Sequence, residues 1–185
     1  MKQQITKNAI ETAFLKLLKD RNFEKVMVKD IVEECGLTRN TFYYYYEDTY
    51  NILADILERE IRRMIEEMEA GSGLIQASED IFEFLDENPK IARHLFTSSK
   101  KDDLYGYIGS AVDIVVLRWI ELSAEGKEVT DHDKRKIARM CRYIVQGTIS
   151  EWVERGMKYS IKEEMVQLKQ MLAGVLEQML KNSKQ

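Results

Sequence analysis

Apolar residues recur at helical spacing along almost the whole chain, and this pattern constrains the fold more than any other feature. Residues 5–18, for example, place Ile5, Ala9, Ala13 and Leu17 on one face, with Lys and Glu on the other. Strand-like alternation and sequence repeats are absent, and the chain has a single Pro. The pattern therefore predicts an all-α fold of about nine helices. Their expected ranges are 5–18, 28–35, 39–46, 49–70, 74–87, 89–99, 103–123, 131–155 and 161–182.

Two features divide the predicted helices into three parts. Asp48 is of a type that caps the start of a helix, and the run from Gly71 to Gly73 is the clearest internal break. We therefore expect a helix-turn-helix domain over residues 1–47, a connecting helix over 48–70, and a second helical domain over 71–185.

The first three predicted helices have the spacing of a helix-turn-helix module. Gly36, which tolerates a positive φ, ends the second helix, and Thr38 can cap the third by accepting a backbone N–H. In the third helix Phe42 and Tyr46 lie four residues apart and can anchor one face. A helix cannot bury four consecutive side chains on one face. Tyrosines between these anchors must therefore point elsewhere, and DNA is the natural partner.

The start of the third helix carries polar side chains of the kind that contact base edges. Arg39 could bridge a guanine and Asn40 an adenine, each bidentate pair giving about 1–3 kcal/mol of discrimination. Thr41 and the tyrosine hydroxyls suit phosphates or the thymine methyl group. Because a module this small covers one half-site, we expect a homodimer on double-stranded DNA with a pseudo-palindromic operator.

The charge distribution fits a protein whose N-terminal part alone contacts DNA. The net charge of −4 by itself argues against a nucleic-acid partner. Residues 1–46, however, contain eight Lys and Arg against six Asp and Glu, whereas the remaining residues contain 20 against 26. A mildly basic N-terminal part and an acidic remainder of the chain are thus expected.

The stretch VKDIVEECGLTRNTFYYYYEDTYNILADIL resembles the DNA-binding signature of the TetR/AcrR family of bacterial transcriptional regulators, over roughly residues 5–58. The positions that carry the resemblance are Ile31, Gly36, Leu37, Thr41, Phe42, Tyr43 and Tyr46. The DNA-contacting residues that it implies are Lys29, Thr38, Arg39, Asn40, Thr41, Tyr43, Tyr44, Tyr45 and Thr49. Val28 and Thr49 depart from the family, which often has Thr or Ser and Lys there. We therefore expect weaker general DNA affinity and a flatter salt dependence.

The last two predicted helices carry apolar stripes that suit a four-helix dimer interface. The same stripes, which include Met171, also suit packing within one chain, and each helix is expected to serve both purposes. The segments QGTISEWVERGM and SIKEEM resemble, over a short length, a TetR subgroup that includes dihydroxyacetone-kinase regulators. The residues expected at the dimer interface are Ile144, Thr148, Trp152, Leu168, Leu172, Val175 and Met179.

The middle helices, over about residues 74–123, are expected to form the lobe that binds an effector. Aromatic side chains with a few polar groups are what a small-ligand pocket requires, although the same residues also suit ordinary core and surface. The candidate pocket residues are Phe96, Tyr105, Arg118 and Trp119. We expect a ligand-responsive repressor with a small-molecule effector, and the alternative is a regulator controlled by a protein partner.

Catalytic and metal-binding arrangements do not appear in the sequence. It contains no nucleophile, base and orienting group in a recognisable set, and no metal-ligand spacing, so neither an enzyme nor a cofactor is expected. Cys35 and Cys141 are expected to be buried thiols. No apolar run approaches the ~20 residues of a membrane span, and no export signal is visible. A cytoplasmic protein without membrane contact is therefore expected.

Overall fold

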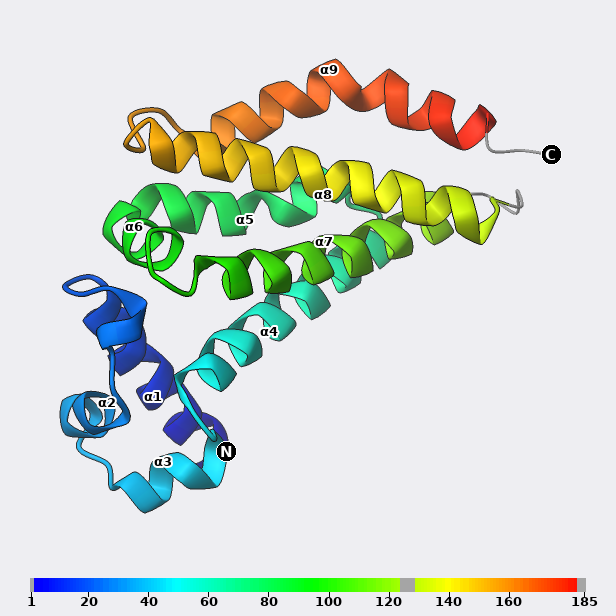
Figure 1. The fold of residues 1–185 in the computed structure, drawn as a ribbon. Coiled ribbons are helices and arrows are strands. Elements are labelled where there is room, and N and C mark those ends of the chain that lie inside the picture. The colour runs from blue at the N-terminus through cyan, green and yellow to red at the C-terminus, as the bar shows by residue number, and fades with distance from the viewer. Residues whose placement is uncertain (1, 124–128, 183–185) are drawn as a thin grey trace. The chain divides into compact units, whose positions relative to one another are not determined.

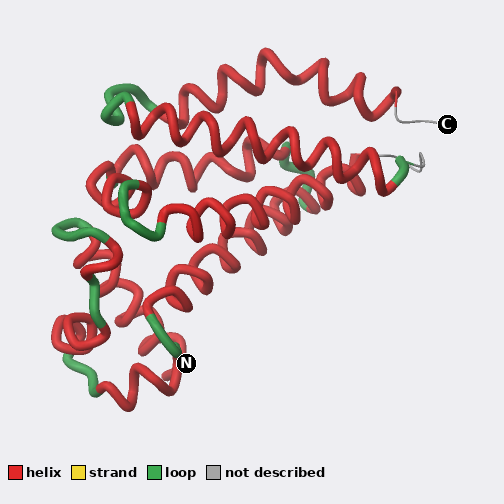
Figure 2. Tube along the Cα trace, in the orientation of Figure 1, coloured by secondary structure: helices red, strands yellow, loops and turns green. Residues whose placement is uncertain are grey.

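The computed structural model describes residues 2–123 and 129–182, which form α-helices, one short 3-10 helix and no strand (Figures 1 and 2). The expected all-α fold is confirmed. No helix in these ranges is long and apolar enough to cross a membrane. The elements are α1 (Lys2–Leu18), η1 (Phe23–Lys25), α2 (Val28–Cys35), α3 (Arg39–Tyr45), α4 (Thr49–Glu69), α5 (Leu74–Glu87), α6 (Pro89–Phe96), α7 (Lys101–Ser123), α8 (Asp131–Glu154) and α9 (Ile161–Asn182).

Side-chain caps mark the starts of α3, α4 and α9, and the first two are expected from the sequence. Thr38, Asp48 and Ser160 each accept a hydrogen bond from the backbone N–H three residues further on, at 3.0–3.1 Å. Pro89 occupies the first turn of α6, where its missing N–H costs least. The expected end of α6 at residue 99 was wrong, because the helix stops at Phe96.

Two compact units make up the chain. The first comprises Met1–Leu57 and Asn88–Leu104, and the second comprises Glu58–Glu87 and Tyr105–Gln185. The segment that contains α6 thus packs with the N-terminal helices, although the sequence pattern placed it in the effector lobe. The assignment of DNA-binding, connecting and effector roles along the chain remains a prediction.

The first unit has an apolar core shared by α1, α2, α3, the start of α4 and α6. Its most completely buried side chains are 0–1% exposed. The unexpected η1 places the Phe23 ring 5.9 Å from that of Phe14, edge to face. A ring nitrogen of His94 lies 2.7 Å from the Leu18 carbonyl oxygen and joins α6 to the end of α1. Core residues from each helix are Phe14, Ile31, Phe42, Ile52 and Ile91.

The second unit has two adjoining apolar clusters. One lies between α7 and α8 and includes Ile120 and Ile137, and the other joins α4, α5 and α7 through Met64 and Ala77. The Trp119 ring packs against both clusters. Cys141 belongs to the first cluster, and burial raises the pKa of its thiol to about 11. The expectation of a buried thiol is therefore confirmed for Cys141, whereas Cys35 is only half-buried.

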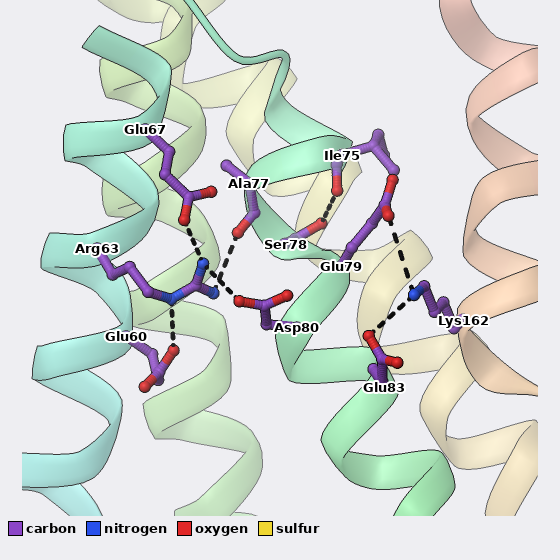
Figure 3. A network of polar contacts seen from close by, with 10 residues as sticks. All are labelled: Glu60, Arg63, Glu67, Ile75, Ala77, Ser78, Glu79, Asp80, Glu83 and Lys162. Carbon is purple, nitrogen blue, oxygen red and sulfur yellow. Dashed lines mark hydrogen bonds and ion pairs between the residues drawn. The ribbon is translucent and has the colours of Figure 1, made fainter. Parts of the chain in front are cut away.

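Polar contacts hold α5 from two sides in the second unit (Figure 3). Arg63 of α4 lies 3.1 Å from the Asp80 carboxylate and donates to the Ala77 carbonyl oxygen at 3.3 Å. On the other side Lys162 of α9 lies 3.0 Å from the Glu83 carboxylate. The acidic residues of α5 thus connect it to both neighbouring helices.

We predict that Asp86→Ala destabilises the second unit. The Asp86 carboxylate accepts hydrogen bonds from the Ser160 hydroxyl at 2.6 Å and from the Ile161 and Lys162 backbone N–H groups at 2.8 and 3.1 Å. It thereby caps α9 from another helix, where the helix dipole also favours a negative charge. Losing the cap should cost about 2–3 kcal/mol of unfolding free energy, measured by urea denaturation. The exposed neighbour Glu87 provides the control, because Glu87→Ala should stay within about 0.5 kcal/mol; equal midpoints for both variants would contradict the prediction.

Candidate nucleic-acid interface

A tight turn joins α2 to α3 and determines where α3 begins. Gly36 has φ +67°, in the left-handed region where a Cβ is strained. The turn is closed by the Leu37 N–H, which donates to the Val32 carbonyl oxygen at 2.9 Å. Thr38 then caps α3 in an extended conformation. The first turn of α3 therefore starts at Arg39, as the sequence predicts.

Two aromatic side chains anchor α3 in the first unit. Phe42 is 0% and Tyr46 is 3% exposed, which confirms that both face the core. The helix ends at Tyr45, one residue before the expected end, because Tyr46 has an extended backbone with φ −140°. Tyr46 still closes the last turn, since its N–H donates to the Phe42 carbonyl oxygen at 3.0 Å.

The opposite face of α3 is open to solvent and carries polar and aromatic groups. Arg39 and Asn40 are exposed in the first turn. Tyr43 is 56% exposed and Tyr44 is 71% exposed. The Tyr44 ring lies edge to face with that of Tyr45, 4.9 Å between centroids. A face of this kind suits contacts in the major groove.

Two of the three threonines in the predicted contact set, Thr38 and Thr41, take part in the cap of α3. The Thr38 hydroxyl accepts from the Thr41 N–H at 3.1 Å and lies 2.9 Å from the Thr41 hydroxyl. These hydroxyls therefore have a local structural role beside any contact with phosphate. Their assignment to DNA remains a prediction.

Lys29 and Arg39 supply the positive charge of α2 and α3. Both side chains are exposed, and neither forms an ion pair with another described residue. In contrast, Arg21 pairs with Asp30 at 3.2 Å and so neutralises an acid beside the start of α2. Lys29 and Arg39 are thus the cations of these two helices that are available to phosphates or bases.

The start of α4 is closed by a pair of reciprocal side-chain caps. The Asn51 side-chain oxygen accepts from the Glu47 and Asp48 N–H groups at 3.0 and 3.3 Å, and the Asp48 carboxylate accepts from the Asn51 N–H at 3.0 Å. The Asp48–Asn51 spacing was available in the sequence, but the role of Asn51 was missed. A carboxylate therefore occupies a helix N-terminus that could otherwise bind phosphate. Thr49, which is half-buried there, remains only a predicted contact.

The four candidate pocket residues do not share one compact unit. Phe96 is 5% exposed and belongs to the first unit, whereas Tyr105, Arg118 and Trp119 belong to the second. Arg118 is engaged by carboxylates, since its guanidinium lies 2.5 Å from Glu69 and 3.0 Å from Glu121. Trp119 is part of the core described above. A pocket lined by all four remains untested.

A cleft of about 440 Å³ lies instead at the turn between α8 and α9. Its lining is polar and comes from Glu151, Arg155, Tyr159 and the first turns of α9. None of the predicted pocket residues lines this cleft. The sequence offered no signal for it, because its residues come from the turn and from both flanking helices.

The predicted dimer residues have different degrees of exposure. Trp152 is 1% exposed, and its indole N–H donates to the Tyr159 carbonyl oxygen at 2.8 Å, so it supports the turn after α8 in its own chain. Val175 is 45% exposed and the adjacent Met171 is 76% exposed. Tyr143 of α8, which was not in the predicted set, is 65% exposed. Half-buried members are Ile144, Thr148, Leu168, Leu172 and Met179.

Comparison with known families matches most of the chain. Residues 10–56 match the model described as bacterial regulatory proteins of the tetR family. Residues 73–174 match the model described as a transcriptional regulator C-terminal region. The second match alone covers more than half of the chain.

Similar sequences are found among regulators of Bacillus subtilis and Lactococcus lactis. The B. subtilis protein YxbF, an uncharacterised HTH-type transcriptional regulator, is 39% identical over 49 residues, which are 26% of this chain and 13% of YxbF. The L. lactis protein DhaS, an HTH-type activator of the dhaKLM operon, is 26% identical over 99 residues, which are 54% of this chain and 53% of DhaS. The matched segments thus span about half or less of these relatives.

Solved structures share the fold along nearly the whole chain. The dihydroxyacetone kinase operon activator DhaS superposes with a TM-score of 0.72 at 21% identity, covering 94% of this chain and 97% of DhaS. The regulator FadR from Bacillus subtilis, solved in complex with stearoyl-CoA, superposes with a TM-score of 0.57 at 20% identity, covering 89% and 96%. At these identities the likeness establishes the fold alone.

Proposed function

The chain belongs to the TetR family of bacterial transcriptional regulators, and from this premise we propose that α3 is the helix that contacts the bases of its operator. Members of this family are DNA-binding regulators rather than enzymes. We further propose that the protein binds a pseudo-palindromic operator as a homodimer and that an effector controls its affinity.

The exposed face of α3 is the observation that carries this proposal. Arg39, Asn40, Tyr43 and Tyr44 are all exposed on a helix whose opposite side is fixed in the core. A recognition helix needs this combination, because base contacts require side chains at defined positions. The ring contacts that the structure gives Tyr43 and Tyr44, with Phe42 and Tyr45, leave more than half of each side chain exposed.

Selection from random double-stranded DNA with the full-length protein tests the proposal. We expect enrichment of a two-fold symmetric sequence whose half-sites lie about one helical turn apart or a multiple of it. Footprinting on genomic DNA then gives the operators and the neighbouring genes. No enriched sequence, or an asymmetric site bound by one chain, would refute the proposed DNA-binding mode.

A small-molecule effector is the form of control that we favour. In support, the related FadR structure contains stearoyl-CoA. An effector shifts the protein away from DNA only if it binds the two states with different affinities. Titration of candidate ligands should therefore lower operator affinity and raise the thermal midpoint together.

Activation by a protein partner is the second candidate. The related DhaS is an operon activator, and α7 of the second unit leaves Tyr107 43% and Ile114 49% exposed. Exposed apolar groups suit a protein contact. A reporter gene distinguishes activation from repression, and substitution of Ile114 by Glu should abolish the response only if a partner binds this face.

We predict that Thr49→Lys strengthens binding to DNA of any sequence. The added cation at the start of α4 would offset the neighbouring acids Glu47 and Asp48 and contact a phosphate. Each new phosphate contact should steepen the slope of log K against log salt by about 0.9, and a dimer gains two contacts. Gln76→Lys, which adds the same charge at an exposed site on α5, is the control. Equal slopes for the two variants would show that no phosphate lies near Thr49.

A further inference from the structure

Packing alone does not explain the hydroxyl group of Tyr46. The ring anchors the end of α3, and a phenylalanine ring would fill the same volume. The hydroxyl, however, donates a hydrogen bond to the Asp55 carboxylate of α4 at 2.8 Å. It also lies 3.4 Å from the Glu11 carboxylate of α1. One atom therefore links the end of α3 to two other helices of the first unit.

Lys7 of α1 completes this polar cluster. Its ammonium group lies 2.8 Å from the same Asp55 oxygen that accepts from Tyr46, and 5.2 Å from the centre of the Tyr46 ring. Burial, followed by the hydrogen bond to Asp55, raises the pKa of Tyr46 above its ordinary value. The hydroxyl therefore remains a hydrogen-bond donor over the physiological pH range.

The cluster is in a position to fix the orientation of α3. Apolar packing of Phe42 and the Tyr46 ring is not directional, so it tolerates small rotations of the helix. A hydrogen bond to a carboxylate weakens steeply when its angle departs from linear. Moving the end of α3 would also take away the hydroxyl that the Asp55 carboxylate and the buried Glu11 carboxylate share, and hydrogen bonds to charged groups are stronger than those between neutral groups.

We propose that Tyr46 and Asp55 are positioning residues, and that the hydrogen bond between them holds the recognition helix at the angle at which it contacts base edges. This inference rests on the proposed function of α3. Neither side chain needs to touch DNA for this role. Base contacts through Arg39 and Asn40 require a defined hydrogen-bond geometry at the base edges, whereas phosphate contacts carry no sequence information and depend mainly on charge. Loss of the hydrogen bond should therefore weaken binding to the operator more than binding to random DNA.

Tyr46→Phe tests the hydrogen bond, and Tyr50→Phe is its matched control. Tyr50 lies in the same unit, and its buried hydroxyl has no hydrogen-bond partner among the described residues. Full-length variants are titrated with the selected operator and with random DNA at one salt concentration, well below their thermal midpoints. We expect Tyr46→Phe to lose about tenfold or more in operator affinity, as for loss of a charge-assisted hydrogen bond, and less than twofold on random DNA. Tyr50→Phe should match the wild type on both.

Asp55→Asn provides the second variant, because it keeps the shape of the side chain and removes the charge. If the Tyr46–Asp55 bond is the cause, the double variant loses no more than the stronger single variant. Additive losses would overturn the inference, as would equal losses on operator and random DNA or an unchanged operator affinity for Tyr46→Phe. If Arg39→Ala loses operator binding and Tyr46→Phe keeps it, the proposed function of α3 stands and the positioning role of Tyr46 is wrong. A wild-type protein without any preferred sequence would overturn both.

Discussion

Replacing Arg39 with Ala is expected to abolish specific operator binding while leaving the protein folded and dimeric. Arg39 is the first residue of α3, is exposed, and forms no ion pair with another described residue. Its removal therefore breaks no ion pair within the described residues. A bidentate contact with a guanine contributes about 1–3 kcal/mol of discrimination. Because a dimer makes the contact twice, operator affinity should fall about 30-fold to 20,000-fold.

Arg39→Lys separates base recognition from charge. Lysine keeps the positive charge but lacks the planar fork that binds two acceptors at once. This variant should keep the affinity for random DNA and its salt dependence, and lose most of the preference for the operator. Binding is measured by fluorescence anisotropy at a fixed salt concentration, with thermal melting as the check on folding. A wild-type footprint for Arg39→Ala would rule out α3 as the recognition helix.

Tyr44 allows a companion substitution on the same face. Its side chain is 71% exposed, and the contact that the structure gives its ring is with Tyr45. Tyr44→Ala should therefore leave the unfolding free energy within about 0.5 kcal/mol of the wild type. A loss of operator binding in this variant would then report a direct contact with DNA.

Local signals in the sequence were sufficient to predict most of the fold and the exposed face of α3. Helical periodicity and capping depend on residues within four positions of each other. Gly36, Thr38 and Asp48 therefore indicated the end of α2 and the starts of α3 and α4 correctly. The alternation of anchored and exposed positions in α3 follows from the same helical geometry, which placed Phe42 and Tyr46 in the core.

Contacts between distant segments could not be predicted in this way. The cap that Asp86 provides for α9 joins residues 75 positions apart, and the packing of α6 in the first unit includes a contact between His94 and Leu18, 76 positions apart. Nothing in the local pattern of either segment distinguishes its partner. The hydroxyl of Tyr46 was missed for the same reason, since Asp55 and Glu11 approach it only in the folded unit.

Apolar stripes on a helix also fail to distinguish packing within a chain from packing between chains. Trp152 and Val175 were predicted together at a dimer interface, yet Trp152 is buried by its own chain whereas Val175 is 45% exposed. Both lie on periodic apolar faces, so the hydrophobic pattern treats them alike. Their exposure in one protomer is the property that separates them. It identifies the surface of α9 on which an interface can be tested.

A pair of glutamates on this surface is expected to convert the proposed dimer to a monomer. Met171 and Val175 lie one helical turn apart on α9 and are 76% and 45% exposed. In a two-fold interface each substitution occurs on both chains and meets its own symmetry-related surface. The double variant Met171→Glu with Val175→Glu would therefore bury four like charges in the interface. Burial of an unpaired charge costs several kcal/mol, which is sufficient to separate the chains at micromolar concentration in sedimentation experiments.

Ile114→Glu on α7 is the matched control, because it replaces another half-exposed apolar residue of the second unit with an acid. It should leave the dimer intact. A dimer that survives both glutamates on α9 would place the interface elsewhere.

The effect of the α9 double variant on DNA binding also differs from that of Arg39→Ala. A monomer still carries a complete α3, so the α9 variant should lose about 100-fold or more on the full operator, as bivalent binding is lost, and keep wild-type affinity for an isolated half-site. Arg39→Ala should lose affinity for both DNA fragments, which makes recognition and dimerisation separately measurable.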